Sequence, residues 1–486
     1  MRVFETLFLV LLLFSVIGFS LGLLKKRNAG LYVVGFVVLA GFLSILFEGY
    51  RLQLVPAFFL TIVLLVATLV KEYAPGIKAK KTMKRFGVFL LILFTIPSLL
   101  ILLLFPVVQL PAPRGSYPVG TTLMSFIDLS REELFTQAAD NRNIPVQVWY
   151  PASSNTGGKQ VARWISSEEA MGLFTKYRNL PDLLGYFSLV NTHSNLDVDV
   201  SDAEDKYPVV LFSGGGAMFN GQNVIQMEEL ASRGYIVFAV GHPYEDFACI
   251  YPDGSIVPYS EQQRQALSED TAKAVEVAKQ TVTDTKSGDF HKAILRNAVI
   301  NNDSLRGWSE DMHFIADKII EMNDGREKSI FVGKLDVLNM GAFGHSFGGA
   351  ASGQLCLEDE RIKAFINMDG SPFGDAPDRE ITQPFMILTQ GGEGKTLIQT
   401  GYCDTEKNFT VVQINGAEHM NFSDLNSLIP AVGKLSGFLG SIRAQRQVNI
   451  MNHYILDFFD KHLKGKASTL LDVPSSIYPE VTVYRQ

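Results

Sequence analysis

Cysteine is scarce in this chain of 486 residues, which contains only Cys249, Cys356 and Cys403. None belongs to a CxxC pair and none has a histidine at ligand spacing, so the sequence predicts neither a disulfide framework nor a structural zinc site. An oxidising compartment would allow one bridge, but the sequence does not select a pair. The sequence also has no internal repeat and no low-complexity tract.

Acidic residues are rare in the first part of the chain. Residues 1–110 carry eleven Lys and Arg against three Asp and Glu, whereas the remainder carries 32 against 47. A basic, apolar front followed by an acidic globular body indicates a membrane region over 1–110 and a separate domain over 111–486. Because nucleic-acid binding needs clustered Lys and Arg, the acidic body excludes nucleic acid as a partner.

Four stretches of the front part lack charged residues. Each has about the 20 residues that a helix needs to cross roughly 30 Å of hydrocarbon. Buried helices of a soluble domain would need an amphipathic layer to cover them, and the short polar breaks supply none. We therefore predict a multi-pass protein of the cell membrane, with spans at Thr6–Leu24, Asn28–Phe47, Leu52–Val70 and Phe86–Pro113.

The loops between these stretches predict an orientation, because cytoplasmic loops are enriched in Lys and Arg. The second break holds only Glu48 and Arg51, whereas the first and third breaks are basic. We expect the N-terminus and the body after the fourth span to lie outside the cytoplasm. The basic residues of the first and third breaks are Lys25, Lys26, Arg27, Lys71, Lys78, Lys80, Lys81, Lys84 and Arg85.

Short apolar runs alternate with polar helical stretches in the body. Such runs are typical of strands buried on both faces of a parallel sheet, so we predict a doubly wound α/β fold. The expected strands are Thr121–Ile127, Val146–Tyr150, Pro208–Phe212, Ile236–Val240, Val337–Phe343, Ala364–Met368, Phe385–Thr389 and Thr410–Ile414. The expected helices are Gln222–Arg233, Trp308–Met322, Ala350–Leu357 and Val448–Leu463.

Residues 251–305 interrupt this alternation with a polar, helical stretch. An insertion there would lie at the carboxyl edge of the sheet, where open α/β folds bind ligands. We interpret the stretch as a cap over the active site, with a surface excursion of no functional role as the alternative.

The strongest motif is Gly344-His345-Ser346-Phe347-Gly348, which follows an expected strand and precedes an expected helix. In that context GxSxG is typical of a sharp turn that lifts a nucleophilic serine above the sheet. The helix N-terminus that follows favours an oxyanion. We therefore expect Ser346 to be the nucleophile and assign His345 a packing role.

A serine nucleophile needs a base and an acid, which follow it in the order Ser, acid, His in this kind of fold. His419 lies in a loop just past the last expected strand and is the expected base, whereas His453 and His462 lie on a helix with apolar neighbours. The acid is Asp369, after the first strand beyond the nucleophile, or Glu393, after the next one.

Stabilisation of an oxyanion needs two backbone N–H groups. Phe347, the residue after the nucleophile, is expected to supply one, and the glycine-rich loop Ser213–Ala217 the other. No Lys-Ser or Lys-Thr pair follows this loop, which argues against a bound nucleotide. We expect no cofactor and no metal.

With these residues assembled, the body resembles the platelet-activating-factor acetylhydrolase family over most of residues 113–465. The resemblance implies a metal-independent hydrolase of short or oxidised acyl esters of phospholipids and of simple esters. It also implies Asp369, and not Glu393, as the acid. It rests on Val146–Pro151, Pro208–Gly216, Ala231–Tyr235, Gly344–Gly349 and His419–Asp424, of which the last is the most specific.

Two features depart from that family. Gly214-Gly215 stands where the family usually has His-Gly, in the loop whose Gly216 N–H we expect to make the second oxyanion contact. The family's animal members also lack four membrane spans.

The expected function is a membrane-anchored serine ester hydrolase acting on a lipid or other apolar ester. The alternatives are a general carboxylesterase or polyester hydrolase with Glu393 as the acid, and a non-catalytic sensor on a hydrolase scaffold.

Overall fold

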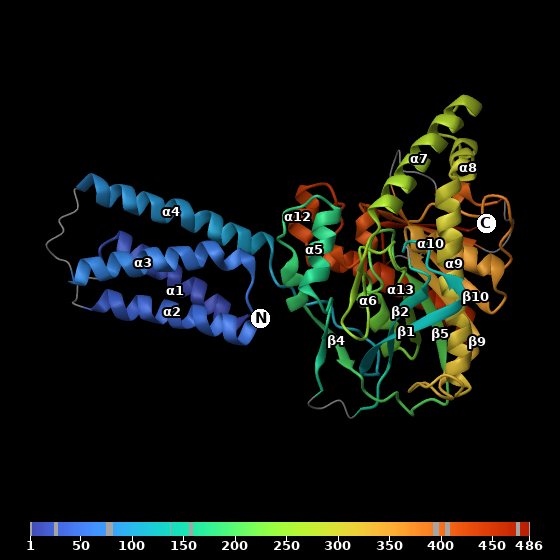
Figure 1. Cartoon of the computed structure of the whole chain (residues 1–486), viewed down its shortest axis with the longest axis horizontal. Coiled ribbons are helices and arrows are strands. Elements are labelled where there is room, and N and C mark those ends of the chain that lie inside the picture. Colours follow the sequence, from blue (N-terminus) through green and yellow to red (C-terminus); the bar gives the residue numbers. More distant parts are fainter. Residues whose placement is uncertain are drawn as a thin grey trace. The chain divides into compact units, whose positions relative to one another are not determined.

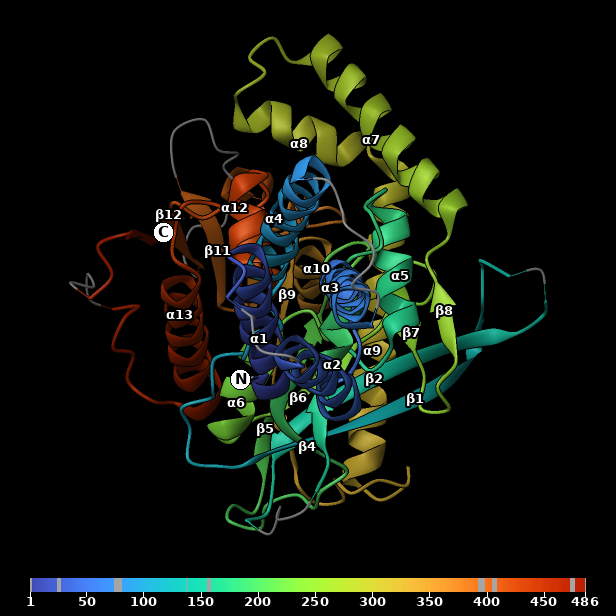
Figure 2. The same ribbon diagram turned by 90° about the vertical axis from the view of Figure 1, so that its left-hand side faces the viewer.

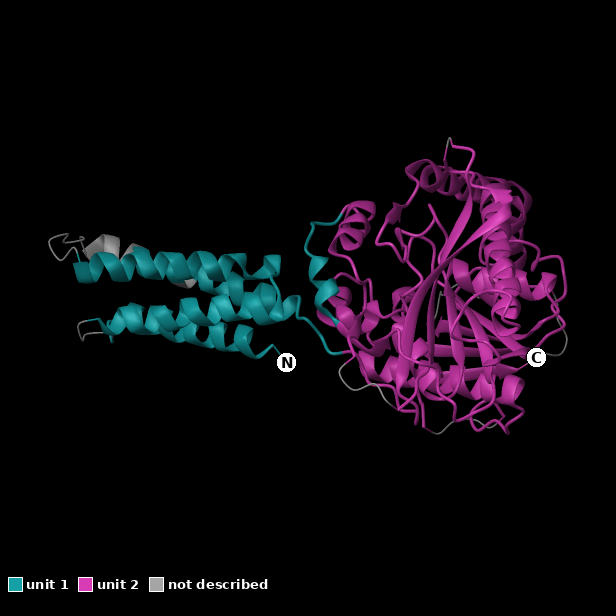
Figure 3. Cartoon of the chain, turned by 60° about the horizontal axis from the view of Figure 1, so that its bottom comes forward, with its two compact units in different colours: residues 1–109, 180–190 teal, residues 110–179, 191–486 magenta. Residues whose placement is uncertain are grey.

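The computed structural model describes residues 2–23, 28–73, 81–136, 138–154, 159–391, 398–403, 409–472 and 477–485. The chain forms two compact units (Figure 3). Unit 1 contains residues 1–109 together with 180–190, and unit 2 contains residues 110–179 and 191–486. The segment 180–190, which includes the short helix η2 (Gly185–Leu189), is thus grouped with the N-terminal helices, a feature that the sequence patterns did not suggest.

Unit 1 is built from apolar helices (Figures 1 and 2). They are α1 (Val3–Ser20), α2 (Ala29–Glu48), η1 (Leu52–Leu54), α3 (Val55–Tyr73) and α4 (Lys81–Leu104). By length and composition, four helical stretches of the described chain are long and apolar enough to cross a membrane.

The fourth helix ends earlier than the predicted span Phe86–Pro113. Helix α4 ends at Leu104, and residues 106–114 have no regular structure. Pro106 is the physical reason, because a proline disfavours helical conformation in the residue before it, and Pro111 and Pro113 follow.

Charged residues at one set of helix ends in unit 1 pair with one another. The Glu5 carboxylate accepts hydrogen bonds from Arg2 Nε (2.7 Å) and Arg51 Nε (3.1 Å). The backbone N–H groups of Phe4 and Glu5 donate to the Glu48 carboxylate at 2.9 and 2.8 Å. The two arginines and two glutamates at these helix ends carry no net charge together. The predicted membrane orientation therefore depends on the basic loops between the helices. Residues 24–27 and 74–80 of those loops lie outside the described chain.

Unit 2 contains a sheet in the order β13-β12-β11-β10-β9-β5-β6-β2-β1-β4-β3. The six strands from β12 to β6 in this order are parallel, which confirms the predicted α/β fold. The strands are β1 (Val119–Glu132), β2 (Asn141–Pro151), β3 (Val161–Arg163), β4 (Asn191–Leu196), β5 (Tyr207–Ser213), β6 (Ile236–Val240), β9 (Leu335–His345), β10 (Ile362–Met368), β11 (Phe385–Gly391), β12 (Phe409–Asn415) and β13 (Val481–Arg485).

Helices cover both faces of this sheet. On β9, Ala342 belongs to the core formed with α9 (Val299–Asn323) and α10 (Phe347–Glu358). The next residue, Phe343, instead contacts Phe459 of α13 (Ala444–Lys464), with ring centroids 6.0 Å apart. Helix α6 (Val224–Ser232) packs beside α13. This alternation along a central strand is expected of a doubly wound sheet.

The predicted cap region consists of a short hairpin and helices. Strands β7 (Ala248–Ile250) and β8 (Ile256–Pro258) pair, and α7 (Glu261–Thr281), α8 (Gly288–Asn297) and the start of α9 follow. The helix expected over Trp308–Met322 is therefore the second part of a longer one. The remaining elements are α5 (Glu168–Tyr177), η3 (Ile398–Gly401), η4 (His419–Phe422), α11 (Leu425–Leu428) and α12 (Pro430–Leu435).

The turn between β9 and α10 generates a stability prediction. A Cβ on Gly348 would lie 2.1 Å from the Gly214 carbonyl oxygen and 2.2 Å from that of Ser213, whereas one on Gly172 would meet nothing within 4 Å. We expect Gly348→Ala to lower the free energy of unfolding by about 3 kcal/mol or more. The control Gly172→Ala, also in a helix, should raise it by about 0.5–1 kcal/mol. Thermal unfolding of the purified full chain measures both, and similar values for the two would contradict the packing.

Candidate active site

Ser346 occupies the turn between strand β9 and helix α10. Its backbone has φ 55° and ψ −122°, a conformation that side-chain-bearing residues rarely adopt. The Ser346 N–H donates to the Met368 carbonyl oxygen at the end of β10 (2.8 Å). The strand-turn-helix context expected for the motif is therefore present.

Three side chains that are far apart in the sequence meet at this turn. His419 Nε2 lies 3.0 Å from Ser346 Oγ, and His419 Nδ1 lies 2.7 Å from Asp369 Oδ2. Because a carboxylate only accepts, Nδ1 carries the proton and Nε2 is left to accept from the serine hydroxyl. The His419 side chain is 41% exposed and that of Asp369 is 1% exposed, so the histidine can reach a substrate while the carboxylate is shielded from water.

Asp369 is held by several donors. Its own backbone has φ 57°, and its N–H donates to the Leu388 carbonyl oxygen (2.8 Å). Its carboxylate accepts from Thr389 Oγ1 (2.7 Å), the Gln390 N–H (3.1 Å) and Gln390 Nε2 (3.2 Å). These bonds orient the carboxylate toward His419. The alternative acid, Glu393, lies outside the described residues.

His345 supports the loop that carries His419. Its Nε2 donates to the His419 carbonyl oxygen (3.0 Å), and its Nδ1 accepts from Gln222 Nε2 (2.9 Å). Burial lowers the pKa of His345 well below its usual value, and the nearby His419 lowers it further. A neutral imidazole satisfies both bonds, so His345 has a hydrogen-bonding role beyond the packing role expected from the sequence.

The residues that follow His419 fix the same loop from inside. Asn421 Oδ1 accepts from the N–H groups of Glu418 (2.8 Å) and Gly440 (2.7 Å). The buried Asp424 carboxylate accepts from Trp164 Nε1 (3.0 Å), and burial raises the pKa of Asp424 well above its usual value. These bonds give a physical reason for the length of the motif His419–Asp424.

The glycine-rich loop after β5 lies beside the turn that carries Ser346. Phe347 is the first residue of α10, so its N–H has no partner within the helix. Gly215 N–H is occupied, because it donates to Gln222 Oε1 (2.8 Å). A Cβ on Gly216 would lie 3.6 Å from Phe347 Cβ, which places the backbone of these two residues side by side. Phe347 and Gly216 therefore remain the predicted donors of an oxyanion hole. Gln222, which binds both Gly215 and His345, is a residue that the sequence reasoning missed.

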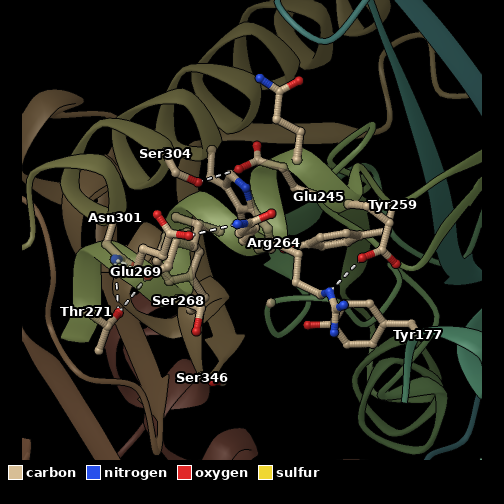
Figure 4. A pocket seen from close by; sticks show the side chains of 17 residues that line it. Tyr177, Glu245, Tyr259, Arg264, Ser268, Glu269, Thr271, Asn301, Ser304 and Ser346 are labelled. Atoms are coloured by element: carbon tan, nitrogen blue, oxygen red, sulfur yellow. Dashed lines mark hydrogen bonds and ion pairs between the residues drawn. The ribbon is translucent and has the colours of Figure 1, made fainter. Parts of the chain in front are cut away.

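A cavity of about 930 Å³ opens beside Ser346 under the cap (Figure 4). Figure 4 shows polar side chains around it, with a hydrogen bond between Ser304 and Glu245 and another between Asn301 and Thr271. Helix α7, which belongs to the stretch predicted to form a cap, contributes much of the lining. The lining of the cavity includes Tyr177, Gly216, Arg264, Trp308, Ser346 and Phe347.

A second Ser–His–Asp arrangement lies buried behind this cavity. His242 Nε2 is 2.9 Å from Ser213 Oγ, and His242 Nδ1 is 2.9 Å from Asp311 Oδ2. Arg142 also donates to Asp311, which it holds at a pKa well below the usual range despite the opposing effect of burial. Burial lowers the pKa of His242. All three members have no exposed surface, and the His242 ring stacks on Trp308 at 3.8 Å.

This topology, with a serine on the turn after a central parallel strand, defines the α/β-hydrolase class of serine hydrolases. Residues 103–470 match the family described as platelet-activating factor acetylhydrolase, isoform II. The chain belongs to this family and is a serine ester hydrolase.

Individual proteins agree with this assignment. The platelet-activating factor acetylhydrolase of Canis lupus familiaris is 26% identical over 381 residues, covering 73% of this chain and 77% of its own. A probable 1-alkyl-2-acetylglycerophosphocholine esterase of Arthroderma benhamiae is 26% identical over 56% of this chain and 65% of its own. The structure of a ferulic acid esterase from Streptomyces cinnamoneus matches with a TM-score of 0.61 and 25% identity, covering 78% of this chain and 99% of its own.

The two hydrogen bonds of His345 can be tested separately. Asn replaces the Nδ1 acceptor but does not reach the His419 carbonyl, whereas Gln reaches that carbonyl and loses the acceptor for Gln222. We expect His345→Asn to lower kcat about tenfold more than His345→Gln. A tenfold difference corresponds to about 1.4 kcal/mol, which is a typical contribution of one hydrogen bond. Steady-state kinetics on a soluble ester measures this difference. Equal losses, or a larger loss for Gln, would contradict the role of His345 in holding His419.

Proposed function

We propose that this chain is a membrane-anchored hydrolase that cleaves short or modified acyl esters of lipids through a Ser-His-Asp acyl-enzyme mechanism. The observation that carries the proposal is the continuous line of contacts from Asp369 through His419 to Ser346, at 2.7 and 3.0 Å. The names of the relatives support a lipid ester as substrate, since they describe an acetylhydrolase and an acetylglycerophosphocholine esterase.

The residues divide the reaction between them. Ser346 Oγ attacks the ester carbonyl carbon while His419 Nε2 takes the hydroxyl proton. The N–H groups of Phe347 and Gly216 stabilise the charge that develops on the carbonyl oxygen. His419 then returns the proton to the leaving alcohol, and water, activated by the same imidazole, hydrolyses the acyl-enzyme. Asp369 fixes the tautomer of His419 and stabilises the imidazolium.

A general carboxylesterase is the second candidate. The many polar side chains that line the 930 Å³ cavity and the similarity to a ferulic acid esterase structure favour it. Rates across a series of acyl esters separate the two candidates: the lipid proposal predicts a preference for esters of glycerolipids over simple alkyl esters with the same acyl group.

The membrane region and the orientation complete the proposal. We assign the anchor to residues 1–110 and the catalytic domain to residues 111–486, which we place outside the cytoplasm. The support comes from four apolar helices and the nine basic residues of two loops. Protease added to intact cells should therefore degrade the catalytic domain. Protection that persists until the membrane is opened would show the inverse orientation.

The choice of acid gives a kinetic prediction. Asp369→Asn should lower kcat by roughly 10³-fold or more, because the asparagine favours the wrong tautomer of His419, as in known triads. Glu393→Gln, the matched change at the alternative position, should lower kcat by less than about tenfold. Both are compared with Ser346→Ala, which sets the residual rate. The reverse ranking of the two amide variants would make Glu393 the acid.

A further inference from the structure

Two cavities meet at Ser346. The first, of about 930 Å³, is the one under the cap. The second, of about 440 Å³, shares Tyr177, Gly216 and Ser346 with the first but is otherwise lined by different residues. They include Arg178, Met218, Glu418, His419, Met420 and Phe438.

The proton path assigns one cavity to each half of an ester. His419 must deliver its proton to the leaving oxygen, so the leaving alcohol has to lie on the His419 side of Ser346. His419 lines the second cavity, whereas the first is reached past Phe347 and Trp308. On the proposed mechanism, the second cavity therefore receives the alcohol and the first receives the acyl group.

The second cavity contains a cation with an unusual environment. Arg178, the residue that ends helix α5, has its guanidinium carbon 5.8 Å from the Phe174 ring centroid and 5.4 Å from that of Tyr177. Its Nε is buried without a hydrogen-bond partner. Among the described residues, Arg178 forms no salt bridge, whereas other arginines such as Arg233 and Arg264 are paired with glutamates. Stacking on two rings holds the planar guanidinium in place without neutralising it.

Arg178 differs from the nearby Arg264 in having no acidic partner among the described residues. Arg264 lies over the same Tyr177 ring at 5.4 Å, but its Nε donates to Glu261 at 2.8 Å, so its charge is compensated. Glu418 is the acidic residue that lines the second cavity in the described chain, and its side chain accepts from the Asn421 N–H in a capping box. Met218, Met420 and Phe438 add apolar surface beside Arg178.

We propose that Arg178 is a specificity-determining residue that binds a phosphate or phosphodiester group on the leaving alcohol. A guanidinium fork matches two phosphate oxygens, and a positioned, uncompensated arginine is the group expected for this task. The methionines and Phe438 contact the carbon skeleton that bears the phosphate. This inference rests on the proposed function, because it needs an ester whose alcohol leaves on the His419 side.

Two esters that differ only in the phosphate test the assignment. The probes are 1-O-hexyl-2-acetylglycerol and its 3-phosphomethyl diester, hydrolysed by the purified full chain in a neutral detergent. The wild-type chain should prefer the diester. Arg178→Gln should lower kcat/KM for the diester about tenfold to a hundredfold while changing that for the neutral ester less than about twofold, as expected for loss of a charge-assisted contact. Arg178→Lys should fall between these values.

Arg264→Gln is the matched control, because it removes an arginine from the same tyrosine ring in the first cavity. It should change both esters by the same factor. Inorganic phosphate should inhibit the wild-type chain competitively and should inhibit Arg178→Gln much less. If phosphate inhibits in this way but the wild-type chain shows no preference between the two esters, Arg178 binds free phosphate and not a lipid headgroup.

The outcomes separate the inference from the proposed function. If Arg178→Gln lowers kcat/KM equally for both esters, the role of Arg178 is wrong. The same holds if the preference for the diester is lost in Arg264→Gln instead. Neither result would contradict ester hydrolysis by Ser346. A wild-type chain that hydrolyses neither ester would overturn the proposed function itself.

Discussion

The close approach of three backbone segments at Ser346 is the constraint on which the site depends. A Cβ on Gly344 would lie 2.3 Å from the backbone of Gly348, and one on Gly370 would lie 1.9 Å from the Ser346 carbonyl oxygen. Gly348 itself is pressed against the end of β5, where the glycine-rich loop begins. Ser346, the segment that follows Asp369 and the glycine-rich loop after β5 are therefore held together by backbone contacts that tolerate no side chain. This packing maintains the positive φ of Ser346.

The two Ser–His–Asp arrangements of unit 2 illustrate that residue types alone do not define a catalytic site. Ser346 and the partly exposed His419 open onto two cavities, whereas Ser213, His242 and Asp311 are sealed. Asp311 is compensated by arginine, so the buried network satisfies its own charges and has no access to a substrate. Through the stacking of His242 on Trp308, and of Trp308 edge-on to Phe347 at 5.0 Å, it supports the wall of the first cavity.

The sequence patterns predicted the parts of this structure that depend on local periodicity and on chain order. The apolar runs identified the central strands, and GxSxG after such a run located Ser346, because the turn requires small residues there. The choice of Asp369 depends on the family resemblance, since the position after the next strand, that of Glu393, is the commoner one for the acid in this fold. The bonds from Gln222 and the packing of 180–190 with unit 1 left no periodic signal, because they depend on tertiary contacts between distant segments. The predicted span Phe86–Pro113 continues beyond the end of α4, because the apolar sequence continues past Leu104, whereas Pro106 ends the helix.

The assignment of Ser346 as the nucleophile can be tested by covalent labelling of the full chain with a fluorophosphonate, followed by mass-spectrometric mapping of the adduct. The probe reacts with a serine that is activated by a histidine and is accessible from a cavity. We predict a single adduct on the peptide containing Ser346. It should be absent in Ser346→Ala and should form much more slowly in His419→Ala. An adduct on Ser213, or labelling that persists in Ser346→Ala, would contradict the assignment of Ser346 as the nucleophile.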